Sequence, residues 1–156
     1  MIGSSQILPN LFIGTFRRNP EDIDQLRREG VTAVLNVQTE KDMTDWGVNW
    51  NCLEPYYREV GIKVRRVPVR DFDKDDLRRQ LPKCVEFLDE LLRQGRIVYV
   101  HCNMGVNRSP SIAIAYLHWV VGWDLEKATD HVMKCRSCDP YLDVIELASK
   151  DRQRKE

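Results

Sequence analysis

A cysteine and an arginine six positions apart, Cys102 and Arg108, enclose a short loop in the stretch HCNMGVNRSP. A cysteine attacks as the thiolate, and a helix N-terminus together with converging backbone N–H groups favours that anion. The same N–H groups form a cradle for phosphate. Arg108 can hold two phosphate oxygens with its planar guanidinium. The pattern therefore indicates a nucleophile aimed at a bound phosphate.

The rest of this stretch supports the same chemistry. Ser109 can donate a hydrogen bond to the thiolate or to the departing sulfur, and Pro110 suits the first turn of a helix. Gly105 lets the backbone fold tightly around an anion. Between the cysteine and the arginine, five residues are predicted to bind substrate as parts of the loop: Asn103, Met104, Gly105, Val106 and Asn107. His101 is interpreted as a residue that supports the nucleophile through hydrogen bonds to groups around it, rather than as a general base.

The spacing alone does not carry this hypothesis, because Cys52 and Arg58 have the same spacing in CLEPYYR. That second stretch follows no apolar strand, contains no glycine and precedes no capped helix, so we interpret it as chance. The 102–108 loop also lacks the Gly-Lys-Ser/Thr ending of the nucleotide-binding P-loop.

Loss of phosphate from an alcohol requires a proton on the leaving oxygen, and a carboxylic acid opposite the nucleophile can supply it. Four aspartates follow one predicted strand in VPVRDFDKDD. Position favours Asp71 as the general acid, with Asp73 as the next candidate. Asp75 or Asp76 is expected to cap the helix that follows.

The elements that must position these residues alternate between strands and helices. Strands are expected as a pair within 7–14 and at 31–37, 63–69 and 96–100; helices are expected at 19–30, 71–95, 109–122, 123–135 and 141–151. Pro82 is expected to mark the start of the regular part of the second helix. The pattern predicts an α/β fold with a central, mostly parallel sheet of about five strands flanked by helices. Cys102 then lies at the carboxyl end of a strand, where such folds bind ligands.

Composition limits the class of protein. The 156 residues fit a single domain, 1–156, and the 24 basic and 24 acidic residues give a net charge of zero. We therefore expect neither a nucleic-acid nor a membrane partner. Five cysteines and the absence of a signal-peptide pattern favour a cytoplasmic protein. A lone CxxC, Cys135 and Cys138, has no second ligand pair, so we expect no metal, and we expect no cofactor. A monomer or a weak dimer is expected.

The string HCNMGVNRS resembles the His-Cys-x5-Arg-Ser/Thr signature of the cysteine-dependent protein tyrosine phosphatase superfamily, and RSPSIAIAYL resembles its dual-specificity branch. The resemblance extends from about residue 7 to residue 150. It implies the dual-specificity phosphatase fold and a phosphocysteine intermediate. Matched residue by residue, it makes Cys102 the nucleophile, Arg108 the phosphate clamp and Asp71 the general acid.

A narrower resemblance is to the glucan phosphatases of the laforin and plant starch-excess types, through ILPNLFIGTFRR, GVTAVLNVQTEKDM and KCRSCDPYLD. It implies that Phe72, Trp46 and Tyr141 line a glucan-binding channel. Met104 and Asn107 stand where those enzymes usually have alanine and glycine. The length leaves no room for a separate carbohydrate-binding module.

The resulting prediction is a phosphatase that removes phosphate monoesters from glucans resembling starch or glycogen, with a phosphorylated glucan or a phosphoprotein as its partner. The alternative is a dual-specificity phosphoprotein phosphatase. Two further alternatives are an RNA 5′-triphosphatase, which the neutral net charge disfavours, and a non-catalytic phosphate-binding module, which would need no nucleophile.

Overall fold

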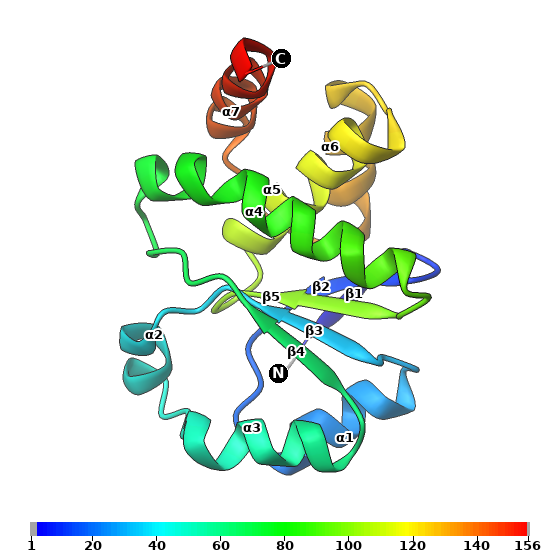
Figure 1. Cartoon of the computed structure of the whole chain (residues 1–156), viewed down its shortest axis with the longest axis vertical. Coiled ribbons are helices and arrows are strands. Elements are labelled where there is room, and N and C mark those ends of the chain that lie inside the picture. Colours follow the sequence, from blue (N-terminus) through cyan, green and yellow to red (C-terminus); the bar gives the residue numbers. More distant parts are fainter. Residues whose placement is uncertain (1–2, 156) are drawn as a thin grey trace.

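The strands form one sheet in the computed structural model of the chain, which describes residues 3–155. They are β1 (Ser4–Leu8), β2 (Leu11–Gly14), β3 (Ala33–Asn36), β4 (Lys63–Arg66) and β5 (Val98–His101). Their order across the sheet is β1-β2-β5-β3-β4. β1 and β2 are antiparallel, and the other neighbouring strands are parallel (Figure 1). The expected α/β fold with a mostly parallel five-stranded sheet is confirmed.

β5 occupies the centre of this sheet. It pairs with β2 on one side and β3 on the other, and all four of its residues are buried. The carboxyl ends of parallel strands meet at one edge of a sheet. The segments that leave β2, β3, β4 and β5 therefore converge beside Cys102, which is the first residue after β5.

Helices cover both faces of the sheet. They are α1 (Pro20–Arg28), α2 (Glu40–Asp45), α3 (Trp50–Glu59), α4 (Lys74–Arg93), α5 (Arg108–Tyr116), α6 (Leu125–Cys135) and α7 (Leu142–Lys155), and a π-helical segment, η1 (Leu117–Val121), continues α5. Figure 1 shows α4 to α7 on one side of the sheet and α1 and α3 on the other, with α2 beside the sheet edge.

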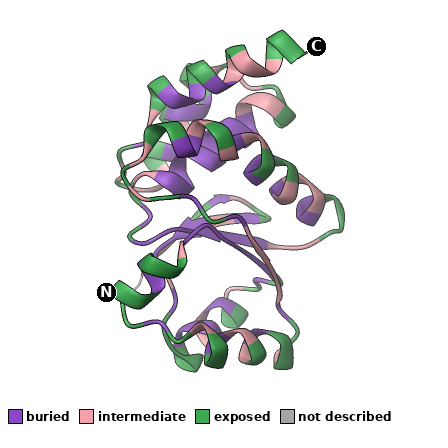
Figure 2. Cartoon of the chain, turned by 60° about the vertical axis from the view of Figure 1, so that its left-hand side comes forward, coloured by how far each residue is buried: buried purple, intermediate pink, exposed green. Residues whose placement is uncertain are grey.

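The side chains of the strands alternate between two hydrophobic cores, as the period of a β-strand requires. Leu35 and Val100 point into the larger core with α4, α5, α6 and α7, whereas Val34 and Tyr99 point into the smaller core with α1 and α3. Figure 2 shows the buried residues gathered on the sheet and on the helix faces turned toward it. The central strands are thus fixed from both sides.

α5 is buried along its whole length, which confirms the interpretation of the apolar run after the loop. Its nine residues are all buried, and those from Ile112 to Tyr116 belong to the larger core. Gly122, with a φ of +93°, ends the η1 continuation in the left-handed region. A helix anchored in this way gives the preceding loop a rigid support.

Two expectations about α4 are wrong. The helix begins at Lys74 and runs through Pro82, because Leu77, Leu81 and Leu88 all pack into the core and hold one face of the helix across the proline. Its cap is Asp73, whose side chain accepts a hydrogen bond from the backbone N–H of residue 76. Asp73 is therefore the capping residue, rather than Asp75 or Asp76.

The C-terminal helix extends further than the sequence pattern indicates. α7 runs to Lys155 because Arg78 of α4 donates two hydrogen bonds, of 2.7 and 2.8 Å, to the carboxylate of Asp151. Among residues 3–155, no helix combines the length and apolar character needed to cross a membrane.

Candidate active site

Cys102 leaves the end of β5 and opens the loop that leads into α5. The residue is 3% exposed, and its Sγ lies 3.4 Å from Oγ of Ser109 in the first turn of α5. The positive end of the α5 dipole therefore lies beside the sulfur. Ser109 is therefore within hydrogen-bonding distance of the sulfur.

His101 lies behind the nucleophile rather than beside it. Its Nδ1 is 3.1 Å from the carbonyl oxygen of Cys102, to which a neutral imidazole donates. Burial lowers the pKa of His101 to about 3 in spite of this hydrogen bond, and the positive charges of Arg17 and Arg108 act in the same direction as burial. His101 is therefore neutral at neutral pH and serves the loop as a hydrogen-bond donor.

Arg108 is almost completely buried, with 1% of its surface exposed. Its Nη1 donates to the backbone carbonyls of Val37 and Val69 and, at 2.8 Å, to Oδ2 of Asp42. Within the described part of the chain, its Nε and Nη2 have no hydrogen-bond partner. One side of the guanidinium is thus fixed by protein, while the other presents two N–H donors to a ligand.

Asp42 belongs to this site, and the sequence analysis missed it. It lies in α2, and its Oδ1 accepts a hydrogen bond from Asn103 while its Oδ2 holds Arg108. Burial alone would raise the pKa of Asp42, but the hydrogen bonds from Arg108 and from the Thr39 backbone hold it below its ordinary value. The only local signal is the capping box that Thr39 and Asp42 form.

Asp71 lies beside the loop, as position in the sequence suggested. Its Oδ2 accepts a hydrogen bond of 3.3 Å from the side-chain amide of Asn103, and its Oδ1 is 3.5 Å from Nε of Arg108. The side-chain amide of Gln38 donates in turn to Oδ1 of Asn103, at 2.9 Å. Asn103 therefore orients both carboxylates, a contribution that the sequence analysis did not assign to its side chain. Asp73 is occupied as the cap of α4.

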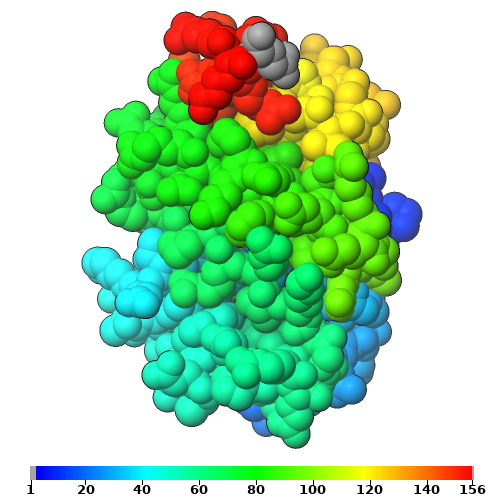
Figure 3. All heavy atoms as spheres, viewed as in Figure 1, coloured from blue at the N-terminus to red at the C-terminus, as the bar shows by residue number. Residues whose placement is uncertain are grey.

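A cavity of about 1000 Å³ opens above Cys102 and Arg108. Its wall is formed by α2, by Trp46 directly after α2, by the segment 70–72 and by the 102–108 loop. The predicted substrate-binding residues in this wall are Trp46, Phe72, Asn103, Met104, Val106 and Asn107. In Figure 3, α2 (cyan) projects at the side of the molecule below the beginning of α4 (green). The cavity is thus built from segments far apart in the sequence.

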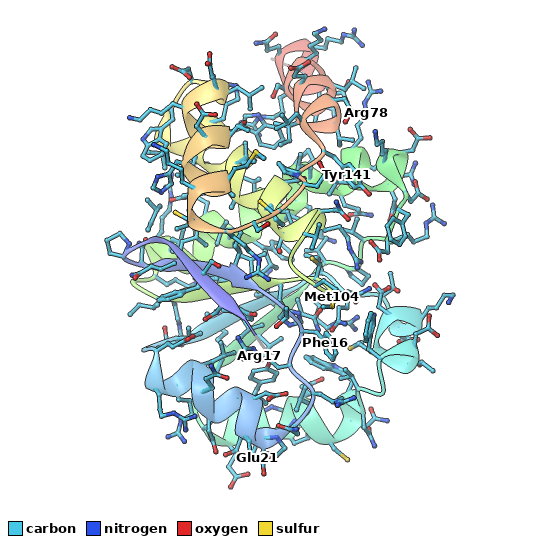
Figure 4. All side chains as sticks on the ribbon, turned by 180° about the vertical axis from the view of Figure 1, so that it is seen from behind. Phe16, Arg17, Glu21, Arg78, Met104 and Tyr141 are labelled. Atoms are coloured by element: carbon cyan, nitrogen blue, oxygen red, sulfur yellow. The ribbon has the colours of Figure 1, made fainter. Side chains whose placement is uncertain are left out.

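The exposed aromatic residues occupy different places. Phe72 and Trp46 lie in the cavity wall, and Phe16 packs against Trp46 with 5.3 Å between ring centroids. Tyr141 lies outside the cavity lining, and Nζ of Lys74 lies 5.3 Å from the centroid of its ring. Figure 4 shows Met104 beside Phe16, with Tyr141 on the side of α7. The structure therefore brings together two of the three aromatics assigned to a channel.

The other cysteine features contribute nothing to this cavity. Cys52 lies in the first turn of α3 and is exposed, so the second Cys-x5-Arg stretch is part of a helix. Cys135 and Cys138 are free thiols at the end of α6 and in the following loop. Among residues 3–155 no group of three or more His, Cys, Asp or Glu side chains is arranged to hold a metal ion.

Comparison with known proteins places this site in a family. Residues 11–141 match the family model "Dual specificity phosphatase, catalytic domain". The chain is 38% identical over 147 residues to phosphoglucan phosphatase DSP4, amyloplastic, of Castanea sativa, covering 93% of this chain and 39% of that protein. It is 36% identical over 155 residues to laforin of Mus musculus, covering 92% of this chain and 47% of that protein.

The fold agrees with this assignment. The crystal structure of PTPMT1 superposes with a TM-score of 0.77 at 23% identity, covering 99% of this chain and all of that one. The chain spans less than half the length of the two curated relatives described above. The Cys102 loop, the buried Arg108 and the matched family model together show that the chain belongs to the dual-specificity phosphatase catalytic-domain family.

Proposed function

We propose that the protein hydrolyses phosphate monoesters of glucans through a phosphocysteine intermediate. The Cys102 thiolate attacks phosphorus while the bond to the leaving sugar oxygen breaks, and Asp71 transfers its proton to that oxygen. Water then attacks the phosphocysteine. Asp71, now a carboxylate, accepts the proton of this water, and the thiolate is released together with inorganic phosphate. The amides of the loop and Arg108 stabilise the charge on the transferring phosphoryl group.

The observation that carries this proposal is the pair of free donors on Arg108. Within residues 3–155, Nε and Nη2 are buried without hydrogen-bond partners at the base of the cavity that also contains Cys102, and the one charged neighbour of Nε is Asp71, at 3.5 Å. Unsatisfied buried donors are costly unless a ligand accepts their hydrogen bonds. Two oxygens of a phosphate fit the forked geometry of a guanidinium. A bound phosphate would take over Nε, which now lies 3.5 Å from Asp71, and free that carboxyl group for proton transfer.

The glucan assignment is supported by the composition of the cavity wall. Phe72 is 80% exposed, and Trp46 is held in place by its contact with Phe16. Flat aromatic faces of this kind pack well on sugar rings. The charged residues of the wall are three basic and three acidic: Lys41, Arg70, Arg108, Asp42, Asp45 and Asp71. A balanced wall suits a substrate with one phosphate on a neutral polymer better than a polyphosphate.

The first test replaces the nucleophile. Cys102→Ser should abolish turnover of para-nitrophenyl phosphate while retaining phosphate binding, because a serine hydroxyl is a far weaker nucleophile that leaves the cradle intact. Cys52→Ser is the matched control, since Cys52 is exposed on α3 and has the same spacing to an arginine. Substantial turnover by the Cys102 variant would refute the covalent mechanism.

The second test separates the substrate classes. Release of phosphate is measured from phosphorylated amylopectin, from glycogen, from a panel of phosphopeptides and from para-nitrophenyl phosphate. We expect the glucans to be preferred over the phosphopeptides in kcat/KM. A preference for phosphopeptides would favour the dual-specificity protein phosphatase, which the family match also supports. Binding of phosphate without turnover of any substrate would indicate a binding module.

We propose that residues 1–156 act as one catalytic domain, so any glucan affinity these residues supply comes from the cavity itself. The cytoplasmic location expected from the five cysteines, and the monomeric or weakly dimeric state, remain predictions.

A further inference from the structure

The carbonyl oxygens of the loop that contains Cys102 are all engaged by groups outside the phosphate-binding cavity. Each of the six residues from 102 to 107 has a carbonyl with such a contact. The partners are His101 Nδ1 for Cys102, Phe16 N for Asn103, Arg136 Nη2 for Met104, Arg136 Nε for Gly105, Asp139 N for Val106, and Ser111 Oγ for Asn107, at 2.7 to 3.1 Å.

This pattern fixes the direction of the backbone N–H groups. In a trans peptide the C=O of one residue points opposite to the N–H of the next, and no peptide bond among residues 3–155 is cis. Carbonyls of residues 103–106 held on the outside therefore turn the N–H groups of residues 104–107 toward the cavity. The outer hydrogen bonds, rather than the loop sequence alone, keep the phosphate cradle open.

One side chain makes two of these bonds. Arg136 is the C-cap residue that directly follows α6. Its Nε and Nη2 donate to the carbonyls of Gly105 and Met104, each at 2.9 Å, while its Nη1 donates to Oγ of Ser5 in β1, at 3.1 Å. All three nitrogens of the guanidinium are thus engaged. Arg136 is not among the residues that line the cavity. It therefore contacts the loop from the side that faces away from the cavity.

Gly105 gives independent evidence for this close approach. Its φ of +69° lies in the left-handed region, and a Cβ at this position would come within 2.8 Å of Arg136 Nη2 and of the backbone of Gly14. The glycine is therefore needed for the packing of the guanidinium against the loop as well as for the turn. Arg136 and the loop fit together as a built contact.

We infer that Arg136 is a positioning residue for the reaction: it holds the Met104 and Gly105 carbonyls away from the phosphate and so orients the N–H groups that bind it. The inference rests on the proposed phosphatase function. The positive charge of Arg136 is suited to this task, because a charged donor makes stronger hydrogen bonds to carbonyls than a neutral one. Without it, either carbonyl can rotate inward and present its oxygen to a phosphate anion.

The test compares Arg136→Met and Arg136→Lys with the wild-type protein. Tungstate, a phosphate-like oxyanion, is titrated by calorimetry, and kcat and KM are measured with para-nitrophenyl phosphate. We expect Arg136→Met to bind tungstate about 10-fold to 100-fold more weakly and to lose kcat by a similar factor, since two charge-assisted hydrogen bonds are lost. Arg136→Lys, which can reach one carbonyl, should lose less in both measurements.

Arg78→Met is the matched control. Arg78 also makes two hydrogen bonds from a guanidinium, and both go to Asp151 of α7. Neither bond involves the loop of residues 102–107. Figure 4 shows Arg78 beside α7, well separated from Met104. This variant should lower the thermal midpoint while leaving tungstate affinity and kcat within about twofold of wild type, because it removes stability without touching the loop.

Three results would overturn the inference. The first is that Arg136→Met binds tungstate as tightly as the wild type. The second, which applies if Arg136→Met does not fold, is that Arg136→Lys binds tungstate as tightly as the wild type, and the third is that Arg78→Met loses as much tungstate affinity as Arg136→Met. Failure of the proposed function gives a different result, a wild-type protein that turns over no phosphate ester. The tungstate titration and the rate of Cys102 alkylation by iodoacetamide at pH 6, followed by peptide mass spectrometry, still test the role of Arg136 in that case.

Discussion

Phe72 has a φ of +58° and is the one residue other than glycine in the described range, 3–155, with a positive φ. This backbone conformation costs a non-glycine residue about 1–2 kcal/mol. The side chain is 80% exposed, so no burial offsets that cost. Strained residues of this kind concentrate at functional sites, and Phe72 directly follows the proposed acid and lines the cavity.

Substitution of Phe72 separates the backbone strain from the aromatic contact. Phe72→Gly should be more stable to urea than Phe72→Ala by about 1 kcal/mol, because glycine adopts positive φ without the Cβ clash. Both variants should lose activity on phosphorylated amylopectin but keep activity on para-nitrophenyl phosphate. Equal losses on both substrates would contradict a role for this ring in binding glucan.

Asn107 shows how a single residue ties the loop to a distant segment. Its Nδ2 donates to the carbonyl oxygen of Asp139, at 2.7 Å, and the N–H of Asp139 donates to the carbonyl oxygen of Val106. An asparagine therefore adds a hydrogen bond that the glycine usual in the similar glucan phosphatases could not make. Met104, by contrast, lines the cavity, as does Trp46.

At the scale of the element, the start of α4 assigns different tasks to two neighbouring aspartates. Asp73 caps the helix by accepting from the N–H of residue 76, at 2.9 Å. Asp71, two residues earlier, turns toward Asn103 and Arg108 instead. The helix cap thus fixes the end of the 70–72 segment, which lines the cavity.

Exchange of each aspartate for alanine should give opposite results. Asp71→Ala should lower kcat on phosphorylated amylopectin by about 10²- to 10⁴-fold, and less on para-nitrophenyl phosphate, whose leaving group needs no proton. Asp73→Ala should keep most of its activity but lower the thermal midpoint by about 2–4 °C, since a helix cap is lost. The reverse pattern of activities would make Asp73 the acid.

At the scale of the whole molecule, burial of neutral His101 makes stability depend on pH. In the unfolded chain the imidazole takes up a proton near its ordinary pKa of 6.5, whereas in the folded protein its pKa is lowered to about 3. The unfolded state therefore binds more protons between these values, and stability falls as the pH is lowered. Asp42, whose pKa is also lowered, adds to the fall only at more acidic pH, near its ordinary value of 3.8 and below.

We expect the free energy of unfolding to fall between pH 7 and pH 5. The contribution of His101 to this fall is at most about 1.4 kcal/mol per pH unit, because it is one titrating group. Urea unfolding at half-unit intervals measures this slope. In His101→Asn, which keeps a donor for the Cys102 carbonyl, the slope over this range should be smaller. An unchanged slope in that variant would show that other groups cause the dependence.

The strand–loop–helix unit around Cys102 could be predicted from the amino-acid sequence. Its signals are local: a β-branched strand before the cysteine, Gly105 in the loop, Pro110 in the first helical turn and an apolar helix after it. Such signals act over a few residues through backbone conformation and periodicity, so they can be interpreted along the chain. The same reasoning placed Asp71 near the sheet edge, since it closely follows a strand.

The distant residues that complete the site are evident only in the folded structure. Asp42 and Gln38 follow β3, and Arg136 follows α6; they reach the loop because β3 lies next to β5 and α6 packs over β1. The course of α4 through Pro82 was settled in the same way, by burial of its leucines. Contacts of this kind depend on strand order and helix packing, which bring segments together across tens of residues and leave no periodic mark in the sequence.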